Sequence, residues 1–309
     1  MSHFADRLIG RGLTIRSRVI VGLDPEVERF PAFLRQRLRE EPTEERLAET
    51  LFSFNRNVIE ASAAVAVGFK PQAAFYEQYG TAGHTALQRT LMLLRDLDIP
   101  IILDGKRNDV AHTARAYAIA WLAPEHPVFK TPNPWRADAL TINGYLGRDG
   151  VVPFLETNRD AGLFVLAKTS NPSSGDLQDL ELTSGQTVAD TMARLADTWG
   201  QDSIGSSGYS NVGIVVGATY PETAARLRQL APRALFLMPG IGAQGGSLQA
   251  ITAAAGAQGV GAYAASSRGV MYPFQPEELA DADWQSSLVQ RVAEAARSLQ
   301  EAVNGAMNG

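Results

Sequence analysis

Residues 99–121 read IPIILDGKRNDVAHTARAYAIAW and join a predicted strand, Ile99–Leu103, to a predicted helix, Ala111–Trp121. The apolar run of the strand does not alternate with polar residues, which is typical of a strand buried on both faces of a parallel sheet. The same unit recurs along the chain. The other predicted strands are Val19–Leu23, Val65–Phe69, Ala139–Ile142, Leu163–Ala167, Val212–Val216, Ala234–Met238 and Gly261–Ala265, and the other predicted helices are Glu44–Ala61, Thr85–Asp96, Val188–Trp199 and Glu222–Leu230.

Eight such units predict a closed (β/α)8 TIM barrel, an α/β fold in which helices cover a parallel sheet. Barrels of this kind run past about 200 residues as one domain, so we expect residues 1–309 to form a single domain. A doubly wound open sheet is the alternative. Three connections are longer than a barrel needs, at 25–42, 123–138 and 171–186, and the last is either a lid or a plain surface loop. The tail at 305–309 is expected to fray.

The charge of the chain excludes one class of partner. The formal net charge is -5 and the basic residues are not clustered, whereas a nucleic-acid-binding surface needs a basic face. The chain has no cysteine, so disulfides and thiolate chemistry are excluded. The first residues lack the apolar stretch of a secretory signal, and no run approaches the roughly 18 apolar residues of a membrane span. We therefore expect a cytoplasmic protein with no membrane partner.

Polar side chains collect at the predicted carboxyl ends of the strands. Any one of them could simply be a solvent-exposed polar residue at the rim of the barrel. In a barrel, however, all these ends open on one face, where active sites are built. Several coinciding ends therefore predict a shared site. Its candidate residues are Asp24, Lys70, Asp104, Lys106, Ser170 and Arg268.

The third strand carries the most specific pattern. Side chains alternate along a strand, so Asp104 and Lys106 point to the same side of the sheet. The following helix is expected to begin near Asp109 and to place Thr113, four residues on, on the same helical face. Two carboxylates then lie within reach of one ammonium group. Each such contact at about 4 Å contributes on the order of 4 kcal/mol at an effective dielectric constant near 20, which keeps the ammonium protonated. A purely structural ion-pair network is the alternative interpretation.

A phosphate site is indicated after the seventh strand. The run PGIGAQGG, residues 239–246, is a glycine-rich loop that leads into a helical pattern, and its backbone N–H groups can surround an anion. Arg268, at the end of the eighth strand, adds a guanidinium group that suits phosphate oxygens. Barrels often bind phosphate at the loops after strands seven and eight.

The run DGKRNDVAHT, Asp104–Thr113, resembles the D-x-K-x-x-D-[IV]-x-x-T signature of the orotidine 5'-phosphate decarboxylase family. The resemblance extends from GLDP at 22–25 to SSRGVMYP at 266–273. The runs FKPQAAFYEQYG, TINGYLG, LAKTSNPSSGD and PGIGAQGG are similar to the longer, bacterial branch of that family. The resemblance implies a TIM barrel that converts orotidine 5'-phosphate to uridine 5'-phosphate and carbon dioxide without a cofactor.

The resemblance also implies roles by position. Lys106 would protonate C6 of the pyrimidine as carbon dioxide leaves, and Asp104 would lie beside the substrate's own carboxylate. Asp109 and Thr113 would enter the site of a partner subunit, so a homodimer with shared active sites is expected. The other implied site residues are Asp24 and Lys70 for the ribose hydroxyls and the catalytic charged chain, Ser170 for the pyrimidine amide, and Pro239, Gln244 and Arg268 for substrate binding, the last two at the phosphate.

Lys168 and the histidines are given lesser roles. Lys168 lies two residues before Ser170, so it is expected to face the same side one layer down, as a supporting rather than a catalytic residue. The four histidines show no metal-ligand spacing, so no metal site is expected.

Three other functions remain open at this point. One is a class I aldolase that forms a Schiff base on Lys106 or Lys70. Another is a different phosphate-sugar barrel enzyme, including a metal-dependent decarboxylase or epimerase. The third is a nucleotide-binding barrel without chemistry, against which the clustered charges of Asp104, Lys106 and Asp109 argue.

Overall fold

The structure, a computed structural model, describes residues 3–241, 246–256 and 259–308. Eight parallel strands form its sheet, in the order β2-β1-β8-β7-β6-β5-β4-β3. The strands are β1 Val19–Leu23, β2 Ala66–Pro71, β3 Ile102–Arg107, β4 Ala139–Ile142, β5 Gly162–Lys168, β6 Val212–Val216, β7 Phe236–Pro239 and β8 Ala262–Ser266.

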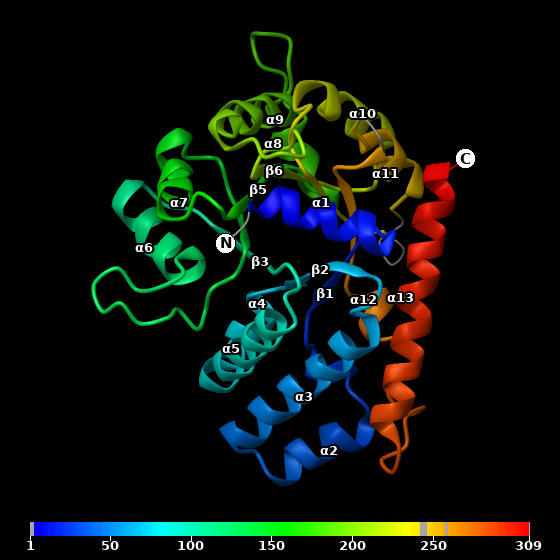
Figure 1. The fold of residues 1–309 in the computed structure, drawn as a ribbon. Coiled ribbons are helices and arrows are strands. Elements are labelled where there is room, and N and C mark those ends of the chain that lie inside the picture. Colours follow the sequence, from blue (N-terminus) through cyan, green and yellow to red (C-terminus); the bar gives the residue numbers. More distant parts are fainter. Residues whose placement is uncertain (1–2, 242–245, 257–258, 309) are drawn as a thin grey trace.

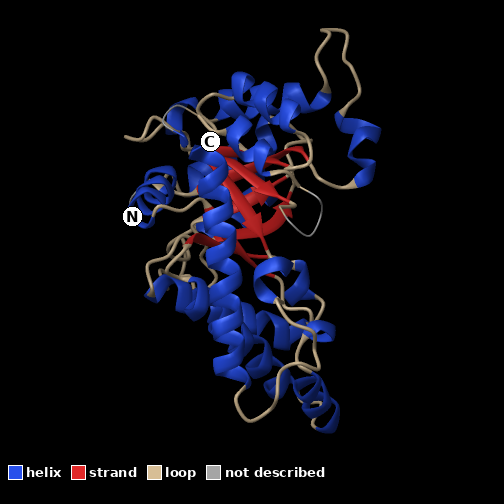
Figure 2. Ribbon diagram, turned by 90° about the vertical axis from the view of Figure 1, so that its right-hand side faces the viewer, coloured by secondary structure: helices blue, strands red, loops and turns tan. Residues whose placement is uncertain are grey.

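The two ends of this strand order meet, so the sheet closes into a barrel. Backbone bridges join Phe69 to Ile101 and Gln72 to Asp104, which brings the edge of β2 against the edge of β3. Figure 2 shows the strands gathered at the centre with helices around them. The predicted (β/α)8 barrel is confirmed, and the open doubly wound alternative is wrong because that sheet would leave two free edges.

The helices follow the strands and cover the outside of the barrel (Figure 1). Short 3-10 turns lie at Val27–Arg29, Arg148–Gly150, Pro172–Ser174 and Gln201–Ser203. The helices are α1 Phe4–Ile15, α2 Ala32–Glu40, α3 Glu44–Ser62, α4 Ala74–Glu77, α5 Gly80–Asp96, α6 Ala111–Leu122, α7 Val152–Thr157, α8 Gly175–Gln178, α9 Val188–Trp199, α10 Pro221–Leu230, α11 Leu248–Ala254, α12 Arg268–Met271 and α13 Trp284–Asn308. None of the helices in the described part of the chain has the length and apolar character needed to cross a membrane.

Apolar side chains pack in two layers, one between the strands and the outer helices and one inside the barrel. The inner layer includes Ile102 of β3, Ala139 of β4 and Phe164 of β5. Helix α1 closes the amino-terminal end of the barrel, where Phe4 and Leu8 are buried against this layer (Figure 1). The amino-terminal end is therefore plugged, and a site on the barrel axis can open only at the other end.

Strand β3 lies later in the sequence than predicted. Its ladder with β4 pairs Ile102 with Ala139 and continues, through a register shift, to Arg107 opposite Ile142. Pro100 has no N–H to give to a ladder, which disfavours an earlier start. Asp104 and Lys106, predicted at the carboxyl end of the strand, therefore lie inside it.

Two of the three long connections contain helices. Residues 25–42 include α2, and residues 171–186 include α8 followed by a hairpin held by a bridge from Glu181 to Thr187. The tail expected to fray, 305–309, is helical in its described part, because α13 continues to Asn308. Contacts hold this end of the helix: Thr252 on α11 donates a hydrogen bond to the carbonyl of Ala306 at 3.1 Å.

Candidate active site

A cavity of about 740 Å³ opens at the carboxyl ends of the strands. This volume is within the usual range for small-molecule sites, about 300–1,000 Å³. On two strands the inner face changes from apolar to polar toward the cavity, from Ile102 to Asp104 on β3 and from Ala139 to Thr141 on β4. The predicted site residues that line it are Asp24, Lys70, Asp104, Lys106, Ser170, Pro239 and Arg268.

The Asp104 carboxylate is the centre of the charged wall, where it accepts four hydrogen bonds. Oδ1 accepts from Lys106 Nζ at 2.7 Å and from Thr141 Oγ1 at 2.8 Å. Oδ2 accepts from Lys70 Nζ at 2.8 Å and from Gln72 Nε2 at 3.0 Å. Because every lone-pair direction has a donor, the carboxylate is fixed in rotation, and it holds both ammonium groups in place.

The charges in this wall follow from its contacts. Burial alone would raise the pKa of Asp104, but the ammonium groups of Lys70 and Lys106 lower it below its usual value. Burial alone would lower the pKa of Lys70, but Asp104 and Asp24 raise it. The Lys70–Asp104 pair is therefore charged throughout the neutral pH range, and a neutral amine at Lys70 is disfavoured.

Asp24 is placed differently from Asp104. Its Oδ1 atom is buried and has no hydrogen-bond partner among the described residues. Burial raises the pKa of Asp24, and nearby Lys70 offsets part of that rise. A buried carboxylate oxygen without a partner is rare in folded proteins, and this one belongs to a residue that lines the cavity.

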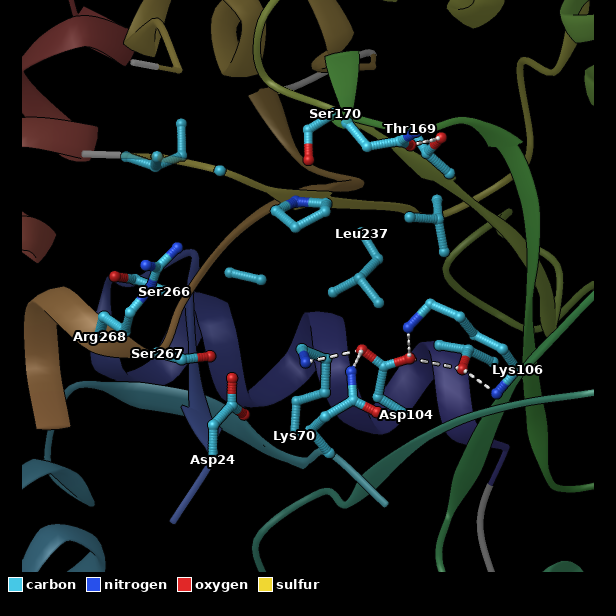
Figure 3. A pocket seen from close by; sticks show the side chains of 18 of the residues that line it. Asp24, Lys70, Asp104, Lys106, Thr169, Ser170, Leu237, Ser266, Ser267 and Arg268 are labelled. Carbon is cyan, nitrogen blue, oxygen red and sulfur yellow. Dashed lines mark hydrogen bonds and ion pairs between the residues drawn. The ribbon is translucent and has the colours of Figure 1, made fainter. Parts of the chain in front are cut away.

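The opposite wall is polar but uncharged (Figure 3). Thr169 and Ser170 lie across the cavity from the row formed by Lys70, Asp104 and Lys106, and Arg268 lies to one side. Gln178 of α8 also reaches this wall, where its amide bonds to Thr169. A ligand in this cavity would therefore meet charged groups on one side, uncharged polar groups on the other, and the guanidinium group of Arg268 at one edge.

Two predicted residues lie outside the cavity of this single chain. Asp109 precedes α6 instead of beginning it, because its carboxylate accepts a hydrogen bond from the N–H of Val110 at 2.8 Å and the helix begins at Ala111. The expected stacking of Asp109 and Thr113 on one helical face is therefore wrong. Neither residue lines the cavity. The predicted phosphate ligand Gln244 lies outside the described residues.

Lys168 does not lie beneath Ser170 on the cavity side as expected. The pairing of β5 with β6 shifts between Leu166 and Lys168, so the alternation of side chains is broken at that point. Lys168 is absent from the cavity lining and its ammonium bonds to Asp179.

Residues 17–282 match the family model described as "Orotidine 5'-phosphate decarboxylase / HUMPS family". The chain belongs to this family. A protein of Rhodopirellula baltica named orotidine 5'-phosphate decarboxylase is 40% identical over 294 residues, covering 93% of this chain and 96% of the relative. One of the same name from Caldicellulosiruptor bescii is 38% identical over 313 residues and covers all of both chains.

Solved structures of the orotidine 5'-phosphate decarboxylase family have the same fold. A putative orotidine-monophosphate decarboxylase from Toxoplasma gondii superposes with a TM-score of 0.79 at 32% identity, covering 100% of this chain and 98% of that one. The OMP decarboxylase of Leishmania donovani superposes with a TM-score of 0.75 at 33% identity over 100% of both chains.

Three residues of this cavity were not predicted from the sequence. Gln72 and Thr141 bind Asp104 directly, and Gln178 lines the uncharged wall. A signal existed for Thr141, which is the one polar residue in the apolar strand β4. Gln72 lies two residues after Lys70, a spacing that places both side chains on the same face of a continuing strand. Gln178 gave no such signal, because it reaches the site from a separate helix.

Proposed function

We propose that this protein decarboxylates orotidine 5'-phosphate to uridine 5'-phosphate and carbon dioxide. It is an orotidine-5'-phosphate decarboxylase, a carboxy-lyase that breaks a carbon–carbon bond, and it serves pyrimidine nucleotide synthesis. The observation that carries the proposal is the Lys106 ammonium, held 2.7 Å from the Asp104 carboxylate in a cavity that also contains Arg268. The family membership of the chain supports the same activity.

Lys106 supplies the proton in the proposed mechanism. The bond between C6 and the carboxylate carbon breaks, carbon dioxide leaves, and the electron pair stays on C6. No adjacent carbonyl can delocalise this pair, so fixed positive charge must stabilise it. Lys106 Nζ provides that charge and then donates a proton to C6, after which solvent restores the ammonium. The exposed fraction of its side chain, 45%, leaves it accessible to a ligand in the cavity.

Asp104 and Lys70 prepare this step. Asp104 holds both ammonium groups, so no reorganisation of charge is required when the carbanion forms. It also places a negative charge beside the substrate carboxylate. Asp24 lines the cavity and would accept a hydrogen bond from a ribose hydroxyl. Ser170 lies on the opposite wall, where it would bind the pyrimidine amide (Figure 3).

A homodimer with shared sites would use the two residues that lie outside the cavity. Asp109 and Thr113 would reach the cavity of a partner subunit, as the family signature implies. Val110, Tyr145 and Leu146 have exposed fractions of 50%, 74% and 42%, and a second subunit packed on this side of the chain would remove them from water. The substrate is a charged phosphate ester that does not cross membranes, so we place the reaction in the cytoplasm.

The proposed function is tested by following the absorbance of orotidine 5'-phosphate in chelator-treated buffer. We expect uridine 5'-phosphate and one equivalent of carbon dioxide, at a rate that the chelator does not change. A rate abolished by the chelator and restored by a divalent metal would instead assign a metal-dependent barrel reaction. Borohydride trapping of Lys70 or Lys106 on a carbonyl substrate would assign an aldolase. The ion pairs of both lysines with Asp104 disfavour that outcome, because a Schiff base requires a neutral amine.

Arg268→Ala is expected to weaken uridine 5'-phosphate binding by about 10- to 100-fold, because a charge-assisted contact to phosphate contributes about 1.5–3 kcal/mol. Affinity for the nucleoside uridine, which lacks the phosphate, should be unchanged. Calorimetric titration of both ligands checks this. Equal affinity of the variant and the wild type for uridine 5'-phosphate would remove Arg268 from the phosphate site.

A further inference from the structure

Lys168 is a buried lysine that the proposed mechanism does not use. Only 3% of its side chain is exposed, at the end of β5. Its Nζ donates hydrogen bonds to both oxygens of Asp179, at 2.7 and 2.8 Å. The ring of Tyr220, in the connection after β6, lies 5.5 Å from the same ammonium group. A buried ammonium without a partner is strongly disfavoured, so this lysine needs its anion.

The two partners differ in their surroundings. The Asp179 side chain is 57% exposed and follows α8, in the long connection after β5. If this connection moved away, water would solvate Asp179 readily, but Lys168 would keep a buried charge. No other ion pair is formed by Lys168 within the part of the chain that the structure describes. The unequal burial therefore favours the arrangement in which α8 lies against the end of β5.

The neighbouring residues make a second contact on the cavity side. Gln178 precedes Asp179, and Thr169 follows Lys168. The N–H of Thr169 donates to Gln178 Oε1 at 2.8 Å, and Gln178 Nε2 donates to Thr169 Oγ1 at 2.8 Å. Lys168 at the end of β5 and Thr169 after it thus bind Asp179 and Gln178, at the end of α8. Thr169 and Gln178 line the cavity, whereas Lys168 and Asp179 do not.

We propose that the Lys168–Asp179 ion pair positions the uncharged wall of the active site, so that Thr169, Ser170 and Gln178 meet the pyrimidine ring. The inference rests on the proposed function, because it assigns the base to that wall. Lys168 and Asp179 are positioning residues, and they act through Gln178 and Thr169. The ion pair fixes the base-binding wall without touching the substrate.

The test compares two neutralising substitutions on the same short segment. Asp179→Asn removes the ion pair, whereas Asp176→Asn removes an exposed carboxylate of α8 outside the cavity lining. Calorimetry measures binding of uridine 5'-phosphate and of D-ribose 5-phosphate, which lacks the base. Asp179→Asn is expected to raise the dissociation constant for uridine 5'-phosphate by about tenfold or more, a change that calorimetry resolves. Its affinity for D-ribose 5-phosphate should stay within about twofold. Asp176→Asn should bind both ligands as the wild type does.

Two further variants keep the test decisive. Asp179→Glu retains the carboxylate and should recover most of the lost affinity. Lys168→Met removes the buried charge together with its need for a partner, so it remains informative if Asp179→Asn folds poorly. Because the two residues act as one unit, Lys168→Met/Asp179→Asn should lose no more affinity than either single variant.

The possible outcomes separate the inference from the function on which it rests. Unchanged binding of uridine 5'-phosphate in Asp179→Asn and Lys168→Met, with binding by the wild type intact, would overturn the positioning role alone. Equal losses of affinity for uridine 5'-phosphate and D-ribose 5-phosphate would also overturn it, because they would indicate a general structural role. A wild-type protein that neither binds uridine 5'-phosphate nor consumes orotidine 5'-phosphate would overturn the proposed function first.

Discussion

Lys106→Ala is expected to fold like the wild type and to lose decarboxylation by at least about 10⁴-fold. A positioned general acid contributes about 10²–10⁴-fold, and a preorganised charge at a developing anion adds about 10²–10³-fold. The substitution removes both contributions, because the same ammonium stabilises the carbanion and protonates it. The loss is measured as the initial rate of orotidine 5'-phosphate consumption at high enzyme concentration.

The fold should tolerate this substitution. The Lys106 side chain is 45% exposed, and Asp104 keeps its hydrogen bonds from Lys70, Thr141 and Gln72 when Lys106 is removed. Circular dichroism and thermal unfolding should therefore match those of the wild type within a few degrees. Lys130→Ala is the control, because this lysine is 69% exposed in the 123–138 connection, away from the cavity lining.

A Lys106→Ala enzyme that kept more than a few per cent of the wild-type rate would remove Lys106 from its assigned role. The proton would then have to come from another group in the cavity, and Lys70 is the other ammonium bound to Asp104. If the rate of Lys130→Ala fell by the same factor relative to the wild type, the assay would be reporting general damage to the protein.

The barrel and most of its charged wall could be predicted from sequence because both depend on local patterns. A strand buried on both faces has a nearly continuous apolar run, and eight such runs leave few other arrangements. Asp104 and Lys106 do meet as predicted, at 2.7 Å, although the register of β3 shifts between Leu103 and Arg107 and Lys106 has a φ of +46°, so their contact depends on the ion pair as well as on strand alternation. The placement of Asp24, Lys70 and Arg268 followed from the rule that strand ends share one face of a barrel.

The predictions that failed depended on backbone details that residue types do not record. Lys168 was expected on the cavity side, and a register shift between β5 and β6 broke the alternation on which that expectation relied. Asp109 was expected to begin a helix, and its carboxylate bonds to the next N–H instead. Gln178 reaches the cavity only because α8 folds back against the end of β5, which is a tertiary contact with no local signature.

Asp109→Ala is expected to lower the rate by about 10²–10³-fold, as removal of one preorganised charge does. The cause would lie in the partner's site, because Asp109 does not line the cavity of its own chain. This dependence on a second subunit can be measured separately from the loss itself. Lys106→Ala and Asp109→Ala each inactivate both sites of a homodimer. In a mixed dimer, however, one subunit lacks the lysine of its own site and the other lacks the aspartate that it supplies to that same site, so the second site is intact.

When equal amounts of the two inactive variants are mixed and allowed to exchange subunits, about a quarter of the wild-type rate should return. Half of the dimers are then mixed by random pairing. Each mixed dimer has one site that carries both substitutions and one site that carries neither, as the two-fold symmetry of a homodimer requires. The recovered rate should follow the rate of subunit exchange and should fall when the mixture is diluted below the dissociation constant of the dimer.

A mixture of Lys106→Ala with Asp104→Ala is the control, because these two residues come from the same chain and line the same cavity. Mixing them leaves every site with at least one substitution, so no activity should return. Failure of the Lys106→Ala and Asp109→Ala mixture to recover, while labelled subunits are shown to exchange, would mean that Asp109 does not act across an interface. The exposed side chains of Val110, Tyr145 and Leu146 would then require another explanation.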